Sequence, residues 1–161
     1  MTTDKPGGAG GASSNRLLLI LLAAGGAGVV LLNRPVPTNI AWGKDLSAAL
    51  ETARADHSAV FVAFVGQACP YCTRMDREVL SNPKVEESIN RFVPVRLDLA
   101  DAPEAAAQYD VYGIPAYRVI TPDGEMIART SGYQPVPQFM RFLRYADLAL
   151  SAGPPAKPDD R

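Results

Sequence analysis

Hydrophobic and polar positions along this chain follow strand and helix periods that meet at one junction near residue 69. Residues 59–65, AVFVAFV, are apolar, rich in β-branched and aromatic side chains, and too short for a typical helix, so they predict a buried strand. Directly afterwards, Cys72, Met75 and Val79 recur at spacings of three and four, which predicts a helix. Pro70 suits the first turn of that helix, where an N–H would lack a partner anyway.

Helical faces are also predicted before and after this junction. We expect a short strand at residues 40–42 and then a helix capped by Asp45, with Leu46, Ala49, Leu50 and Ala53 on its apolar face. Residues 81–83, SNP, break the pattern, and Val85 and Ile89 begin another short helical face.

The second half of the chain predicts strands, a hairpin and a closing helix. Residues 92–98 are strand-like, and because Pro94 cannot donate to a ladder, this strand should lie at a sheet edge or carry a bulge. A short helix is expected at residues 103–109. Strands at 117–120 and 125–129 flank a PDG turn, which predicts a hairpin. The last helix is amphipathic, with an apolar face of Val136, Phe139, Met140, Leu143, Ala146 and Leu150.

An apolar segment near the N-terminus precedes this pattern. Residues 1–16 are rich in Gly, Ala, Ser and Thr, and we expect a flexible leader. From Leu17 to Leu32 the chain is wholly apolar or glycine, a helix of about 24 Å against a hydrocarbon core of about 30 Å. We favour an uncleaved transmembrane anchor at residues 17–33, because the segment has no polar face and no Ala-x-Ala cleavage pattern. A cleaved signal segment is the alternative.

The domain boundaries follow from these patterns. Residues 34–39 include Pro35 and Pro37 and predict a stiff linker. Residues 40–150 hold the folded domain, and residues 151–161 predict a disordered tail.

Composition and charge narrow the classes of partner. The chain has 161 residues, 47% hydrophobic and 20% charged, with a formal net charge of -1. This balance supports one domain with a real core plus appendages. It offers no basic footprint for nucleic acid, which we therefore exclude as a partner.

Both cysteines of the chain lie in one motif, Cys69-Pro70-Tyr71-Cys72, at the strand-to-helix junction. A thiolate there would face unpaired N–H groups and the positive end of the helix dipole, which lowers its pKa. Zinc needs about four ligands, while the chain adds only His57 to the two cysteines. Thr73 stands where a c-type haem site needs histidine, and a two-residue loop makes a poor structural disulfide. The motif therefore favours redox chemistry, with no metal and no cofactor.

Residues 40–148 resemble the thioredoxin superfamily in the order of their elements and in the residues at the joints. The CPYC motif opens the second helix, Gly113-Ile114-Pro115 resembles the family loop with a cis proline facing the disulfide, and Gly132 follows the hairpin. The stretch from Cys72 to Val85 is similar to the C-terminal, thioredoxin-like domain of the DsbD transmembrane electron transporters. The resemblance implies an α/β thioredoxin-like fold, a mixed sheet flanked by helices, preceded here by one transmembrane helix.

The resemblance also implies a function and its residues. Cys69 and Cys72 would be catalytic, as nucleophile and resolving thiol, while Ile114, Pro115 and Tyr71 would bind substrate. The partners would be protein disulfides or dithiols, with residues 17–33 in the membrane. Since these relatives work outside the cytoplasm, the expected location is the bacterial inner membrane, single-pass, with the domain in the periplasm.

Two positions depart from the thioredoxin pattern. Ala63 stands where thioredoxins usually carry a buried aspartate that assists proton transfer, and Ala68 stands where they carry tryptophan. These departures keep open a second hypothesis, a tethered binding module, such as a chaperone or metal carrier, with incidental cysteines.

Overall fold

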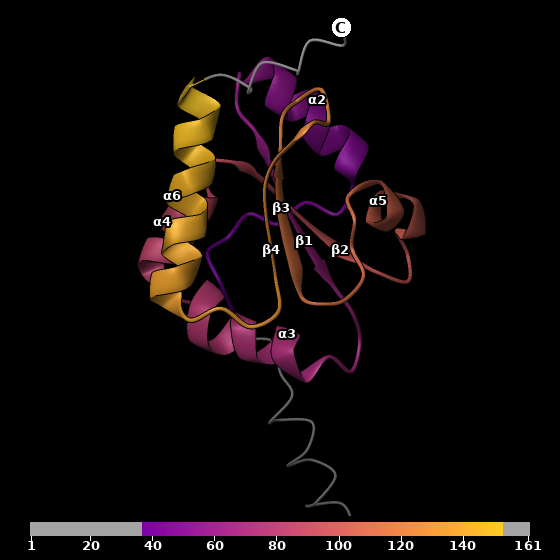
Figure 1. The fold of residues 1–161 in the computed structure, drawn as a ribbon, viewed down its shortest axis with the longest axis vertical. Helices are drawn as coiled ribbons and strands as arrows, with labels where there is room; N and C mark the ends of the chain where they lie inside the picture. Colours follow the sequence, from indigo (N-terminus) through magenta and orange to yellow (C-terminus); the bar gives the residue numbers. More distant parts are fainter. Residues whose placement is uncertain (1–36, 153–161) are drawn as a thin grey trace, which may run out of the picture. The chain divides into compact units, whose positions relative to one another are not determined.

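A four-stranded mixed sheet organises residues 37–152, the part of the chain that this computed structural model describes (Figure 1). The strands are β1 (Val60–Val65), β2 (Val93–Asp98), β3 (Ala116–Ile120) and β4 (Met126–Ser131). They lie in the order β2-β1-β3-β4, with β2 parallel to β1 and the other two pairs antiparallel. The expected mixed α/β sheet is thus confirmed.

Helices cover both faces of this sheet. They are α2 (Leu46–Ala55), α3 (Pro70–Met75), the π-helical turn η1 (Asp76–Leu80), α4 (Pro83–Ile89), α5 (Pro103–Gln108) and α6 (Val136–Ala152). Figure 1 shows α4 and α6 on one side of the sheet and α2 and α5 on the other. The single helix expected after Cys69 is in fact α3 followed by η1, and the wider turn lets the adjacent Val79 and Leu80 both be buried.

The core is built around β1, every residue of which is buried. Its side chains alternate between the two faces, as strand geometry requires. Phe61 packs toward α6, with its ring centroid 5.9 Å from that of Tyr117 and 6.3 Å from that of Phe139. Phe64 belongs to the cluster on the opposite face, with residues of α2 and α5. The strand predicted from the apolar run is confirmed.

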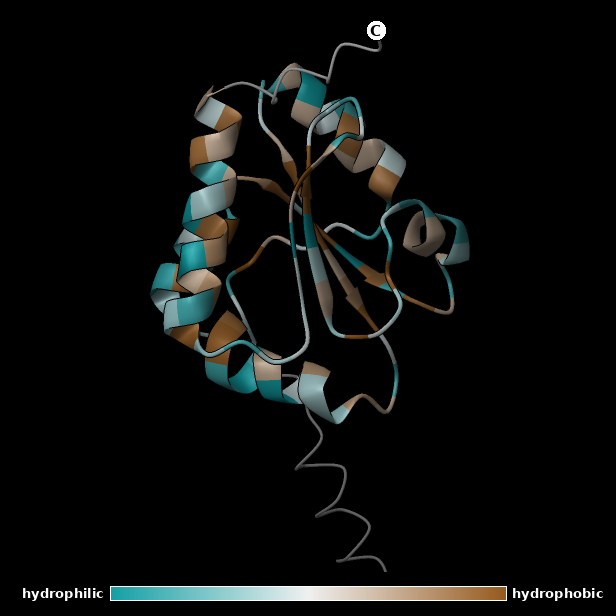
Figure 2. Cartoon of the chain, in the orientation of Figure 1, coloured by the Kyte–Doolittle hydropathy of each residue, from teal (hydrophilic) through white to brown (hydrophobic). Residues whose placement is uncertain are grey.

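Side chains cap the N-termini of α2 and α4. Asp45 Oδ1 accepts from the Ala48 N–H at 3.0 Å and caps α2, and Asn82 Oδ1 accepts from the Lys84 N–H at 3.1 Å and caps α4. In α6, Phe139 and Leu143 face the core, and the alternation of brown and teal along this helix in Figure 2 follows its amphipathic pattern. The predicted cap at Asp45 and the predicted amphipathic helix are confirmed; the cap at Asn82 was not predicted.

The strand expected at residues 40–42 is wrong, because the N–H groups that a ladder would need have other partners. The Trp42 N–H donates to the Ile40 carbonyl at 2.9 Å. The Asn39 N–H donates to Glu86 Oε1 at 3.0 Å, and the Ala41 N–H donates to Asn90 Oδ1 at 3.2 Å. Only one isolated bridge forms in this segment, between Gly43 and Val95 of β2. Because this bridge adds no further strand, β2 is an edge strand of the sheet. This agrees with the edge position predicted for the strand that contains Pro94.

The proposed leader, the anchor or signal segment at residues 17–33, and most of the linker lie outside the described residues. Within residues 37–152, no helix combines the length and apolarity needed to cross a bilayer. At the other end, α6 continues to Ala152, two residues past the boundary expected at 150. The remainder of the proposed tail also lies outside the described residues.

Candidate active site

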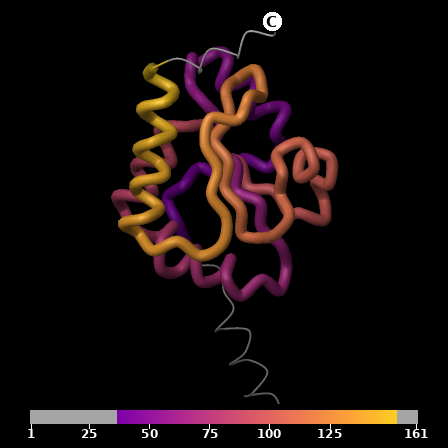
Figure 3. The backbone as a smooth tube through the Cα atoms, in the orientation of Figure 1, coloured from indigo at the N-terminus to yellow at the C-terminus, as the bar shows by residue number. Residues whose placement is uncertain are grey.

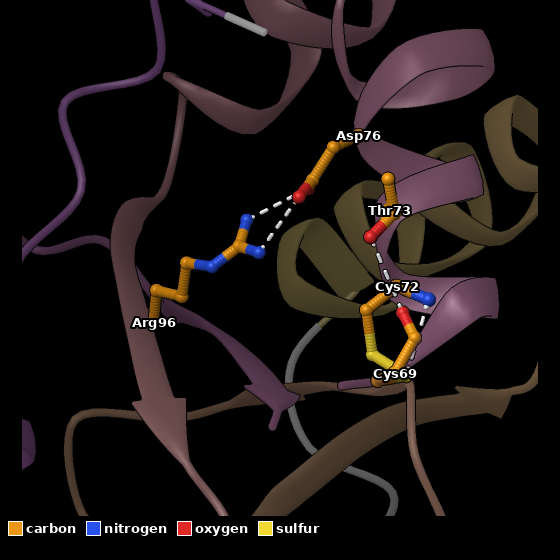
Figure 4. Close-up of a disulfide and its surroundings, with 5 residues drawn as sticks. All are labelled: Cys69, Cys72, Thr73, Asp76 and Arg96. Carbon is orange, nitrogen blue, oxygen red and sulfur yellow. Dashed lines mark hydrogen bonds and ion pairs between the residues drawn. A yellow bond between two sulfur atoms is a disulfide. The ribbon is translucent and has the colours of Figure 1, made fainter. Parts of the chain in front are cut away.

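The two cysteines form a disulfide at the start of α3 (Figure 4). Their Cα atoms lie 5.3 Å apart. Cys69 is the N-cap of the helix, and its Sγ accepts a hydrogen bond from the Cys72 N–H at 3.2 Å. A sulfur at this position faces the unpaired N–H groups of the first helical turn, which stabilise a thiolate there.

The chain reaches this helix through a strained residue. Ala68, directly before Cys69, has φ 52°, in the left-handed region. For a residue with a side chain this conformation costs about 1–2 kcal/mol. The turn redirects the chain from the end of β1 into α3, so the fold holds Cys69 at the helix start rather than within the strand.

The two sulfur-bearing residues differ in exposure. Cys72 is only 4% exposed, whereas Cys69 is half-buried. A large partner therefore reaches Cys69 more readily than Cys72. This asymmetry suits Cys69 to attack a partner and Cys72 to act from within the protein.

The Ile114–Pro115 peptide bond is cis, as the family resemblance implied. Ala116, the first residue of β3, pairs with Phe64 near the end of β1, so Pro115 lies at the same end of the sheet as the loop leading to Cys69. Figure 3 shows the start of β3 and the end of β4 at the end of the sheet where α3 lies. The Gly132 N–H donates to the Pro115 carbonyl at 2.7 Å and ties these two segments together.

Ile114 reaches the loop after β1 because Gly66 has no side chain. A Cβ atom on Gly66 would lie 2.7 Å from Ile114 Cδ1. The cis-proline loop and the segment leading to the disulfide are therefore in close contact. The structure brings Ile114 and Pro115 to the end of the sheet that carries Cys69.

Two exposed tyrosines lie in the segments that form this end of the sheet. Tyr71, between the cysteines, is 59% exposed, and Tyr112, just before the cis-proline loop, is 94% exposed. Sequence reasoning named Tyr71 as a substrate-binding residue and gave Tyr112 no role. Exposed aromatic side chains supply large contact area for a partner.

A partly buried ion pair lies behind the disulfide. Arg96 of β2 and Asp76 point toward each other in Figure 4 and form two hydrogen bonds of 2.7 and 2.8 Å. The Asp76 carboxylate raises the pKa of the Arg96 guanidinium. Because Asp76 follows Cys72 by four residues, the two share one face of the helical segment.

Ala63 lies between two polar residues in one row across the sheet. It pairs with Arg96 on β2 and with Tyr117 on β3. Burial raises the pKa of the Tyr117 phenol well above its ordinary value, and its hydroxyl has no hydrogen-bond partner within residues 37–152. Ala63 has no carboxylate to offer its neighbours in this row. The carboxylate next to the row is that of Asp76, which is hydrogen-bonded to Arg96.

Arg74 of α3 is engaged at the surface, away from the disulfide. Its Nε lies 3.0 Å from Glu78 Oε2, and its guanidinium lies 4.0 Å from the ring centroid of Tyr133. The Tyr133 hydroxyl donates to Glu78 at 2.6 Å. These three side chains, called here the surface clasp, join the active-site helix to the segment that follows Gly132.

Among the described residues, no group of three or more His, Cys, Asp or Glu side chains is placed to hold a metal ion. His57 is exposed in a turn before β1. Sequence reasoning missed the Asp76–Arg96 pair and the surface clasp. The spacing of four between Cys72 and Asp76 was the available signal for the first. In the clasp, the spacing of four between Arg74 and Glu78 was visible, whereas Tyr133 lies 55 residues from Glu78 and left no signal.

Comparison with known proteins agrees with this geometry. Residues 46–147 match the family described as a thioredoxin-like domain. The thiol:disulfide interchange protein DsbD of Pseudomonas fluorescens is 32% identical over 91 residues. That alignment covers 54% of this chain and 16% of the relative, so the chain spans a small part of that protein's length.

Solved structures show the same fold. A thioredoxin from Thermus thermophilus superposes with a TM-score of 0.65 at 30% identity, over 71% of this chain and 92% of that one. The reduced DsbD C-terminal domain of Neisseria meningitidis gives a TM-score of 0.52 at 25% identity, over 64% and 92%. A DsbH oxidoreductase, at 22% identity and a TM-score of 0.60 over 71% and 89%, supports the fold alone. This chain belongs to the thioredoxin-like family.

Proposed function

We propose that this protein is a membrane-anchored thiol–disulfide oxidoreductase that exchanges electrons with partner proteins through Cys69 and Cys72. The observation that carries the proposal is the position of Cys69, a half-buried residue at the N-cap of α3 that is already paired with the buried Cys72. A helix N-cap favours the thiolate, and the thiolate is the form that attacks disulfides.

The reaction transfers two electrons in two exchanges. In the reducing direction, the Cys69 thiolate attacks one sulfur of a partner disulfide, and the other partner sulfur leaves as a thiolate. The Cys72 thiolate then attacks Cys69 in the mixed disulfide and releases the second partner thiolate. The partner ends as a dithiol and this protein as the disulfide. The difference between the two reduction potentials sets the direction of flow.

The partner chain would lie across the cis-proline loop. The loop sits at the end of the sheet that carries Cys69, and the Ile114 backbone would hydrogen-bond to an extended partner segment. Tyr71 would add contact area beside the disulfide, since it is largely exposed. Protein disulfides and dithiols, rather than small molecules, fit an open surface of this kind.

The anchor and the location complete the proposal. Residues 17–33 would span the bacterial inner membrane once and place the domain in the periplasm, an oxidising compartment in which disulfide exchange has substrates. Cell fractionation tests the anchor: the protein should stay with the membrane through high-salt and carbonate washes, because salt releases only electrostatic attachment. A mature N-terminus beyond about residue 25 would instead mean a cleaved signal segment.

Single cysteine variants test the chemistry. Cys69→Ser should abolish the reduction of protein disulfides, and Cys72→Ser should trap mixed disulfides, which separate on non-reducing gels and release on reduction. Half-buried Thr73, whose hydroxyl donates to the Cys69 carbonyl at 3.4 Å, offers a matched control, because Thr73→Ser changes the same helix without removing a sulfur or that hydroxyl. If both cysteine variants kept wild-type turnover, the chain would be a binding module, the second hypothesis that Ala63 and Ala68 suggest.

A further inference from the structure

Arg118 is a buried cation in the middle of β3. Only 2% of its surface is exposed. Its guanidinium donates to the backbone carbonyls of Tyr109 and Asp110 at 2.8 Å each, of Tyr117 at 2.9 Å and of Thr130 at 3.1 Å. A fifth and longer contact, at 3.5 Å, is to the Ser131 hydroxyl. These acceptors are four main-chain oxygens and one hydroxyl rather than carboxylates, so the guanidinium mainly holds backbone in place.

The free-energy cost of removing a charge from water indicates that a buried arginine such as Arg118 has a specific role. Burying a charge is costly unless hydrogen bonds replace its hydration, and an apolar side chain would avoid that cost. Burial lowers the pKa of the Arg118 guanidinium, but the ordinary value is so high that the group stays charged. The planar fork of arginine can reach several carbonyls at once, which a lysine ammonium on the same stem cannot match.

The carbonyls belong to the backbone on both sides of the cis-proline loop. Tyr109 and Asp110 follow the end of α5 and begin the loop that runs to Pro115, and Asp110 holds φ 52°. Thr130 lies in β4, two residues before Gly132, whose N–H donates to the Pro115 carbonyl. One side chain thus fixes the first residues of the loop and the strand that supports its last residue.

We propose that Arg118 is a positioning residue for partner binding, which holds residues 110–115 in the shape that receives the partner's backbone. This inference rests on the proposed function. It places the role of Arg118 in recognition, since its contacts are with the loop backbone rather than with Cys69 or Cys72. Loss of the fork should therefore weaken binding of a protein disulfide more than it slows exchange with a small disulfide.

The test compares two substrates in Arg118→Lys and Arg118→Met. We expect KM for insulin disulfides to rise about tenfold or more, while the rate with 5,5′-dithiobis(2-nitrobenzoic acid) stays within about twofold of wild type. Hydrogen exchange should accelerate at the amides of residues 111–114 and stay unchanged at residues 61–64 of β1. The equilibrium constant for exchange between glutathione and the Cys69–Cys72 disulfide should be the same in the variants as in the wild type, because Arg118 does not contact the disulfide.

Arg129→Met is the matched control. Arg129 pairs with Arg118 across the hairpin and lies 3.5 Å from Asp110 Oδ2, at the surface. The control should keep the wild-type KM. An equal rise in the control, an unchanged KM in both Arg118 variants, or equal losses with both substrates would overturn the inference, as would failure of both Arg118 variants to fold. A wild-type protein inactive toward both substrates would instead refute the proposed function.

Discussion

Both carboxylate oxygens of Asp76 accept hydrogen bonds from the Arg96 guanidinium, across 20 residues of sequence. The pair joins the helical segment behind the disulfide to the edge strand β2. Its side chains are 16% and 29% exposed, so it lies between a surface ion pair and a buried one. Arg96 also lies 5.8 Å from the ring centroid of Trp42, which adds a cation–π contact.

Arg96→Met should destabilise the protein by about 1–2 kcal/mol, because it leaves a partly buried carboxylate without its donors. Denaturant unfolding measures the change. Asp76→Asn should recover part of the loss in the Arg96→Met background, since the carboxylate charge is then gone. Additive single effects in this double-mutant cycle would show that the two residues do not act as a pair.

Tyr117→Phe should leave stability unchanged or raise it by about 1 kcal/mol. The Tyr117 hydroxyl is buried and has no hydrogen-bond partner within the described residues, and an unpaired polar group carries a desolvation cost. The ring contacts with Phe61 and Phe139 persist in the variant. Thermal unfolding is the measurement, and a clear fall in Tm would mean that the hydroxyl does have a partner.

The pKa of the Cys69 thiol in the reduced protein should lie below the value of about 8.5 for a free cysteine. The cause is its place at the N-cap of α3, where it receives the Cys72 N–H. The rate of iodoacetamide alkylation as a function of pH gives the value, with Cys72→Ala used to assign it to one sulfur. A thiol that titrates near 8.5 would favour the binding-module hypothesis.

The Glu78 carboxyl should titrate below its ordinary pKa. The hydrogen bond from Tyr133 is the main cause of the lowered pKa, and the bond from Arg74 adds to it. Because the folded pKa is the lower one, the clasp stabilises the fold above the unfolded pKa and loses this contribution as pH falls through the folded value. NMR titration of the Glu78 side chain measures this pKa.

Tyr133→Phe is the control for this titration. It removes the hydroxyl and keeps the ring beside Arg74. The Glu78 pKa should rise toward its ordinary value in the variant. An identical titration curve in both proteins would mean that Tyr133 does not bind Glu78 in solution.

Local patterns explain why much of the fold could be predicted. Three of the predicted features depend on neighbours close in sequence: the apolar run that forms β1, the spacing of Phe139 and Leu143 in α6, and the cap Asp45. The resemblance then supplied what local pattern cannot, the cis bond before Pro115.

The features that could not be predicted depend on distant partners. Residues 40–42 have a strand-like composition, but Asn90 takes the Ala41 N–H, and Glu86 and Asn90 hold Asn39 directly before this segment. Arg118 stands in a strand that is otherwise apolar or aromatic, which was a visible anomaly, yet its carbonyl acceptors follow only from the assembled loop and hairpin. The Asp76–Arg96 ion pair likewise forms only when β2 lies beside β1 in the folded protein, so it could not be predicted from local sequence.

The attachment of Asn39 to α4 has a mechanical consequence. The Asn39 backbone and side chain bond to Glu86 at 3.0 Å each, and Asn90 Nδ2 donates to the Asn39 carbonyl at 2.9 Å. Tension applied to the chain ahead of residue 39 would reach α4 through these bonds before it reached any strand. Since α4 packs against α6 on the flank of the sheet, these two helices would share such a load.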